Sequence, residues 1–157
     1  MDEKGELNKK LAKALLIDKS IATAQALLEA GADPGYINME GSYKGSLLQT
    51  AVTYSYQSYF REMAIVLLDH GANINEIDSH FKYSILMTAI ENKSYEFARY
   101  LIDHGADYNY VINNEGDFKN GWTALRWLEA GEENQESKSL IDYLKSKGAS
   151  TGFVDMW

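Results

Sequence analysis

The chain has 157 residues, no cysteine and one proline, and its 15 lysines and arginines against 23 aspartates and glutamates give a net charge of −8. The lack of cysteine excludes disulfide bonds and thiolate metal sites, so the fold must depend on packing alone. The negative charge repels phosphate backbones and anionic lipids, and we expect neither nucleic acid nor membrane as a ligand. An acidic surface also aids solubility, so the charge favours a basic partner without requiring one.

The first 35 residues predict a pair of helices at the amino terminus. Leu7, Leu11 and Leu15 recur every four residues, and Ser20 is placed to cap a second helix that continues to Leu28. The charged start differs from a secretory signal, and no apolar run approaches the roughly 20 residues needed to span a membrane. We therefore expect a cytoplasmic protein.

One phrase occurs at residues 27–33, 67–73 and 101–107, with a fainter copy at 143–150. It consists of Leu-Leu or Leu-Ile followed by five residues that end in Gly-Ala-Asp or Gly-Ala-Asn. Each copy indicates the end of a helix, with apolar residues facing a core and a glycine that permits positive φ at the reversal. The helix-ending glycines are Gly31, Gly71, Gly105 and Gly148.

A second signature precedes three of these phrases, at residues 46–51, 84–89 and 123–128. Each copy begins with Ser or Thr, which suits a helix N-cap. Together, the two signatures predict that each repeat contains two short helices.

This pairing resembles the ankyrin repeat, whose hallmark is Thr-Pro-Leu-His-x-Ala followed, after a second helix, by Leu-Leu-x-x-Gly-Ala-Asp. The family's Thr falls on Ser46, Ser84 and Thr123, whereas its Pro and His are replaced in all three copies. The resemblance implies an all-α ankyrin-repeat solenoid of about four helix pairs with β-hairpin finger loops. We expect a single domain over residues 1–157, divided into 1–35, 36–75, 76–109 and a last repeat with its cap at 110–157, whose outer end includes residues 153–157.

The spacing departs from the family in two repeats and two fingers. Ser84 lies 21 residues before Gly105, which is the family's spacing, whereas the equivalent distances in the repeats before and after it are both 25. We place the additional residues between the helices, at 54–60 and 131–136. The fingers at 31–46 and 105–123 are also elongated, and such insertions collect in loops, often on the binding face.

The finger loops are rich in aromatic side chains, which anchor many protein interfaces. The resemblance further implies a concave groove faced by Tyr54 and Glu91. The predicted partner-binding residues are Tyr43, Tyr54, His80, Phe81, Tyr83, Glu91, Phe118 and Trp122. The alternative for each finger aromatic is that it packs internally, against another finger or a helix end.

The sequence offers few candidate catalytic or metal-binding residues. His70 and His104 occupy the same phrase position, which predicts a structural role at a helix end and not metal ligation. The four glutamates in residues 129–136 are typical of a solvated loop. No phosphate-binding loop or nucleophile elbow occurs, so we expect no enzyme activity, no metal and no cofactor.

The leading functional hypothesis is a non-catalytic module that binds a protein partner, and we expect a monomer when it is free. The short chain, eroded repeats and acidic charge are similar to those of small bacterial ankyrin proteins that act as immunity partners of secreted toxins, which suggests a basic toxin or effector as partner. The alternative is a regulatory or effector adaptor that binds cellular proteins or peptides. Fold alone does not decide between the two.

Overall fold

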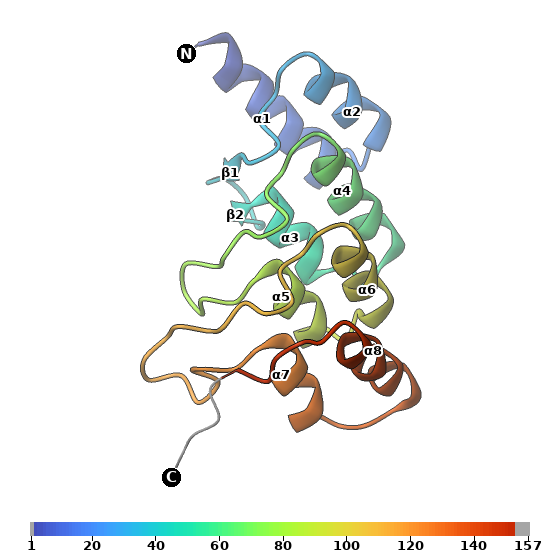
Figure 1. Cartoon of the computed structure of the whole chain (residues 1–157). Coiled ribbons are helices and arrows are strands. Elements are labelled where there is room, and N and C mark those ends of the chain that lie inside the picture. Colours follow the sequence, from blue (N-terminus) through green and yellow to red (C-terminus); the bar gives the residue numbers. More distant parts are fainter. Residues whose placement is uncertain (1, 153–157) are drawn as a thin grey trace. The chain divides into compact units, whose positions relative to one another are not determined.

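The computed structural model describes residues 2–152, which form eight helices in four consecutive pairs (Figure 1). Two compact units divide the chain, Met1–Asn73 and Ile74–Trp157. The first unit contains α1 Glu3–Leu16, α2 Ile21–Glu29, β1 Ile37–Asn38, β2 Gly45–Ser46, α3 Leu47–Thr53 and α4 Ser58–Asp69. The second contains α5 Ile85–Glu91, α6 Tyr95–Asp103, α7 Ala124–Ala130 and α8 Gln135–Ser146. The predicted all-α class and helix pairs are confirmed, the single-domain organisation stays a prediction, and the proposed cap at 153–157 lies outside the described residues.

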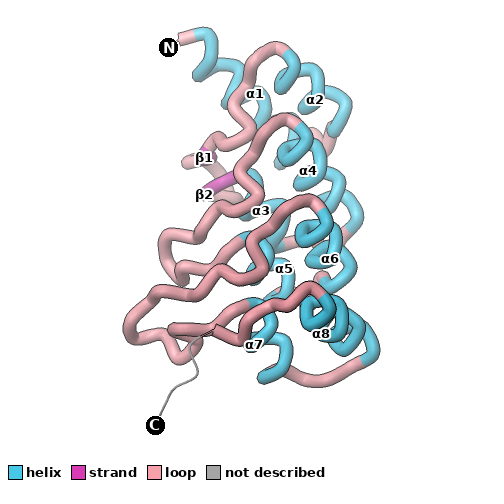
Figure 2. Tube along the Cα trace, viewed as in Figure 1, coloured by secondary structure: helices cyan, strands magenta, loops and turns pink. Residues whose placement is uncertain are grey.

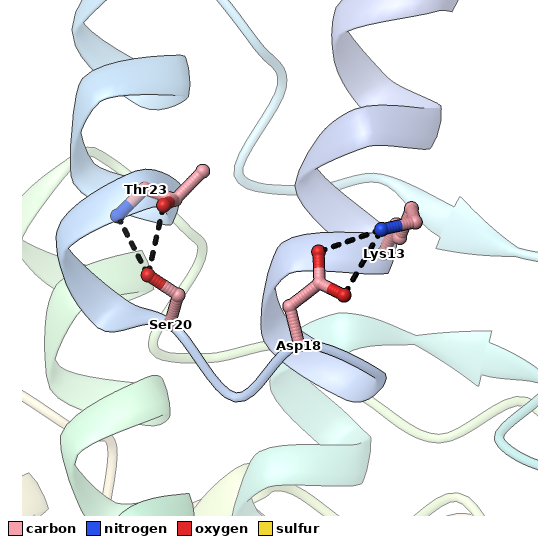
Figure 3. Close-up of polar contacts among 4 residues, drawn as sticks. All are labelled: Lys13, Asp18, Ser20 and Thr23. Atoms are coloured by element: carbon pink, nitrogen blue, oxygen red, sulfur yellow. Dashed lines mark hydrogen bonds and ion pairs between the residues drawn. The ribbon is translucent and has the colours of Figure 1, made fainter.

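Hydroxyl side chains start four of the helices, as the sequence predicts. Ser20, Ser46, Ser84 and Thr123 each accept a hydrogen bond from the backbone N–H three residues later, at 3.2 to 3.4 Å. Figure 3 shows the first of these caps, where Ser20 also donates to the Thr23 hydroxyl, beside the ion pair of Lys13 with Asp18. These bonds satisfy N–H groups that the first turn of a helix leaves without partners.

The four predicted helix-ending glycines all have positive φ: 106° at Gly31, 97° at Gly71, 99° at Gly105 and 75° at Gly148. In each case the backbone N–H of the following alanine donates to the carbonyl oxygen five residues earlier, at 2.9 to 3.1 Å. This bond satisfies one of the last carbonyls of the helix and fixes the reversal of the chain.

Gly105→Ala is expected to lower the free energy of unfolding by about 1 to 2 kcal/mol, because alanine at this φ is strained although its Cβ would meet no atom within 4 Å. Urea unfolding followed by circular dichroism measures the effect. Gly131→Ala is the matched control, since Gly131 has φ of −86° and an added Cβ would make only ordinary contacts at 3.6 Å. Equal losses for the two variants would contradict this explanation.

Each unit has its own core of leucine, isoleucine and methionine. In the first unit, α1 packs on α2, α2 on α4 and α3 on α4, and Leu11, Leu15, Met63 and Leu67 are fully buried between them. In the second, α5 packs on α6 and α7, and α8 packs on α6 and α7, around a core that includes Leu86 and Leu101. Leu67, Leu86 and Leu101 belong to the repeated signatures, so the recurring apolar positions are core positions.

The fingers are mostly turns and loops, and Figure 2 shows strands only in the first of them. There β1 and β2 pair antiparallel, with Ile37 opposite Ser46. The second finger has a single bridge between Ile77 and Ser84, and within residues 2–152 the last segment is tied by a bridge between Trp122 and Gly152. In the second finger, side-chain hydrogen bonds stand in place of those between paired strands. The Asp78 carboxylate accepts from the backbone N–H groups of His80 and Phe81.

The expected insertions between helices are located differently in the structure. Helices α4 and α8 each have 12 residues against nine in α6, and the connection before each of them is longer by one residue only. Most of the additional residues therefore extend the second helix of the pair. In α4 this extension is stabilised by the burial of Phe60 and by the Tyr59 hydroxyl, which donates to the Leu15 carbonyl at 2.5 Å.

Candidate protein-interaction surfaces

The aromatic residues of the second unit form a layered cluster that begins in its core. Tyr83 is only 9% exposed and packs with the buried side chains of Met87 and Ile112. The ring of Trp127 meets that of Tyr83 edge to face, with centroids 4.8 Å apart. Such pairs stabilise a fold beyond the burial of their area. Tyr83, predicted as a partner contact, is thus part of the support beneath the surface.

Two rings stand on this support and remain exposed. Phe81 is 49% exposed and stacks on Tyr83, with centroids 5.4 Å apart, and His80 meets Phe81 edge to face at 4.5 Å. Phe118 is 77% exposed and lies against Trp122 at 5.9 Å. Exposed rings held by a buried layer lose little conformational freedom on binding.

Polar bonds join the second finger to the segment before α7. The Tyr110 hydroxyl donates to the Lys82 carbonyl at 2.8 Å, and the Asn114 side chain donates to the Phe81 carbonyl at 3.2 Å. The Tyr83 hydroxyl donates to the Asp117 carboxylate at 3.0 Å. These bonds hold Phe81 and Phe118 on one connected surface.

Burial raises the pKa of Tyr83 to about 12, with further contributions from the hydrogen bond to Asp117 and from the charges of Asp117, Glu91 and Asp78. In the first unit, burial raises the pKa of Tyr59 to about 12 as well, with the charge of Glu62 as the second cause. Both hydroxyls therefore stay protonated in the folded chain at pH values where an exposed tyrosine ionises.

The free energy of unfolding is expected to fall between pH 10 and 12, because the unfolded state then loses tyrosine protons, those of Tyr59 and Tyr83 among them, that the folded state keeps. Below pH 10 both states hold these protons, and no such dependence arises. Urea midpoints across this range measure the slope, which the double variant Tyr59→Phe with Tyr83→Phe is expected to reduce. The double variant Tyr36→Phe with Tyr56→Phe is the control. An equal reduction of the slope in this control would contradict the assignment to Tyr59 and Tyr83.

The first unit has a second aromatic cluster, contributed by its finger and by α4. Tyr43 and Tyr54 meet edge to face at 5.7 Å, and the Phe60 ring lies 5.1 Å from that of Tyr54. The ammonium of Lys19 lies 4.6 Å from the Phe60 ring and 5.5 Å from that of Tyr43. The predicted contacts Tyr43 and Tyr54 are thus brought together, half-buried and beside a cation.

A groove of about 590 Å³ runs between α1 and the first finger. One face of α1 lines it with Ala12, Leu16 and Ile17, and the finger contributes Tyr36 and Tyr43 among others. Ile17 is exposed beside the groove, as is Met39 on the finger. The groove has the size of a peptide-binding cleft, and Lys9, Lys13 and Glu40 add charged groups to its lining.

The eight predicted partner-binding residues fall into these two clusters, and no observation tests their contact with a partner. Tyr43 and Tyr54 belong to the first unit, and His80, Phe81, Tyr83, Phe118 and Trp122 to the second. Glu91 joins the second cluster through its ion pair with Lys119, at 3.7 Å. The sequence analysis did not select Trp127, Lys19, Lys119 or the groove beside α1; only Trp127, an aromatic residue within a repeat signature, carried a local signal.

The histidines of the repeated phrase have structural contacts. Nδ1 of His70 lies 2.8 Å from the carbonyl oxygen of Val66, and Nδ1 of His104 lies 2.7 Å from that of Tyr100. Each imidazole therefore donates to a carbonyl near the helix end, as its position predicted. Within residues 2–152, no three His, Asp or Glu side chains are grouped in a way that could hold a metal ion.

A family model for ankyrin repeats matches residues 11–112 in three copies. The match covers more than half of the chain, which therefore belongs to the ankyrin-repeat family. Ankyrin repeats are generally protein–protein interaction modules and are typically non-catalytic. A search among curated proteins finds no match to the chain. In the part of the chain that the structure describes, no helix has the length and apolar character to cross a membrane.

Proposed function

We propose that this chain is a non-catalytic module that binds a folded protein through the exposed rings of its second unit. The observation that carries the proposal is that exposed rings rest on supported ones. Phe81 stacks on Tyr83, which is buried and bonded to Asp117, and Phe118 lies against Trp122. Interface hot spots combine large rings with rigid surroundings in this way. The free module is a cytoplasmic monomer in this proposal.

The proposed partner is a basic protein, and specifically a toxin whose activity the module blocks by covering it. The net charge of −8 supports a basic partner, because complementary charge raises the rate of encounter. The proposed role requires only a stable complex and no reaction.

The test is a pull-down of the tagged protein from its source cell, with partners identified by mass spectrometry. The double variant Phe81→Ala with Phe118→Ala is expected to weaken binding by more than tenfold, since each anchor contributes about 2 kcal/mol. Tyr56→Ala is the matched control, because Tyr56 is an exposed ring of the other unit. Unchanged binding in the double variant would exclude these rings as anchors.

The identity of the captured protein then decides the biological role. One stoichiometric partner that loses a toxic activity on binding supports the immunity function. Several unrelated partners, or partners without such activity, exclude it.

The alternative function is an adaptor that binds a peptide segment of cellular proteins, and the groove beside α1 favours it. The groove is larger than a single side chain needs, and apolar residues of α1 face aromatic residues of the finger across it. Ile17→Asp is expected to abolish capture in this case, whereas Phe81→Ala with Phe118→Ala is not. The two sets of variants therefore separate the alternatives.

A further inference from the structure

The ammonium of Lys119 is enclosed by aromatic rings. Its nitrogen lies 4.0 Å from the ring centre of Trp127, 4.6 Å from that of Phe118 and 5.3 Å from that of Tyr83. All three distances are within the range in which a ring face attracts a cation. The Lys119 side chain is only 13% exposed, although it belongs to the long connection before α7.

Oxygen atoms complete the surroundings of this cation. A carboxylate oxygen of Glu91 lies 3.7 Å from the Lys119 nitrogen, and the Tyr83 hydroxyl lies 3.4 Å from it. Proteins hold cationic ligands with aromatic rings, carboxylates and hydroxyls, and all three kinds of group surround this ammonium. We call Tyr83, Glu91 and Trp127 the cage.

The three residues of the cage lie outside the connection that carries Lys119. Tyr83 is packed against Met87 and Ile112, Trp127 is on α7, and Glu91 is the last residue of α5. Lys119 enters from the connection, where its neighbour Phe118 is exposed. The positions of the cage residues therefore do not depend on the Lys119 side chain, whereas the burial of Lys119 depends on the cage.

A small cavity of about 130 Å³ lies next to the cage and shares two of its residues. Glu91 and Trp127 line the cavity together with Glu132, Lys93 and Tyr95. Glu132 and the nearby Glu136 raise the pKa of Tyr95, after burial as the largest cause, so negative charge reaches this side of the cage. The cavity therefore borders the cage at Trp127 and Glu91.

We propose that the cage is a binding site for a lysine side chain of the protein partner, and that Lys119 occupies it as an internal ligand in the free protein. The proposal rests on the protein-binding function proposed above and specifies one contact in it. When the partner docks, its ammonium takes the position of the Lys119 ammonium, and the side chain of Lys119 turns into solvent while the connection keeps its bonds to Tyr83 and Phe81. A basic partner supplies such side chains.

The test uses Lys119→Ala, which empties the cage, and the probe Nα-acetyl-lysine amide. Titration is followed by NMR through the indole N–H of Trp127. We expect saturable binding to Lys119→Ala in the millimolar range and binding to the unaltered protein that is weaker by roughly tenfold, because the tethered Lys119 competes. Nα,Nε-diacetyl-lysine amide, which lacks the charge, is expected not to bind.

Two further variants make the assignment specific. Glu91→Gln in the Lys119→Ala background is expected to weaken probe binding severalfold, whereas Lys44→Ala, which removes an exposed lysine of the first finger, is expected to behave as the unaltered protein. Lys119→Met, which keeps an apolar stem, takes the place of Lys119→Ala if the alanine variant does not fold. Failure of the folded variant to bind, or equal binding of the acetylated probe, would overturn the proposal.

The outcome is distinguishable from that of the pull-down. A partner captured through Phe81 and Phe118, combined with no binding of the lysine probe, would overturn the cation site and leave the protein-binding function in place. Probe binding that depends on Glu91 with no partner captured would support the site and remove the proposed partner.

Discussion

Tyr83→Ala is expected to lower the free energy of unfolding by about 3 to 5 kcal/mol, as the loss of a buried aromatic side chain does in other cores. The substitution removes the ring that separates Met87 and Ile112 from the surface, and it takes away the support of both Phe81 and Trp127. The rings above the resulting cavity cannot fill it without leaving their own contacts. Urea unfolding followed by circular dichroism measures the loss.

Two controls separate the ring from its hydroxyl and from its exposed neighbour. Tyr83→Phe keeps the ring and removes the hydroxyl with its hydrogen bonds to Asp117 and Lys119, and is expected to cost about 1 kcal/mol. Phe81→Ala, two positions away, removes a half-exposed ring and is expected to cost less than Tyr83→Ala. A cost for Phe81→Ala equal to that of Tyr83→Ala would contradict the layered arrangement.

The sequence predicts the starts and ends of the helix pairs because their causes are local. The Ser84 hydroxyl accepts a hydrogen bond from an N–H only three residues along the chain. The positive φ of Gly105 is needed because the chain reverses at that one residue. Such contacts are complete within a few residues. Their repetition then identifies the array, since the same pair of signals recurs along the chain.

The division of the finger aromatics between core and surface was not predictable in the same way. Phe81 and Tyr83 are both aromatic and two residues apart, yet one is exposed and the other is buried. The difference depends on Ile112, Trp127 and Asp117, which are about 30 or more residues away along the chain. No periodicity within a finger contains that information.

Lysines over aromatic rings were missed for a related reason. Lys19 follows α1, but the rings beside it belong to the first finger and to α4. The added length of α4 did have a local signal, because Phe60, Met63 and Leu67 continue one apolar helix face. The spacing of 25 residues from Ser46 to Gly71 was instead assigned to an insertion between the helices, at 54–60.

Leu67→Ala is expected to lower the free energy of unfolding by about 2 to 5 kcal/mol, because Leu67 is fully buried and α4 packs against both α2 and α3. The cavity would lie between α4 and the two helices that pack against it, so little collapse can reduce its cost. The neighbouring Leu68 is half-buried on the same helix, and Leu68→Ala is expected to cost about 1 kcal/mol. Because the two substitutions remove the same atoms and have the same effect on helix propensity, the difference between their urea midpoints isolates packing. Equal midpoints would mean that Leu67 does not face the core, and the packing of this unit would have to be revised.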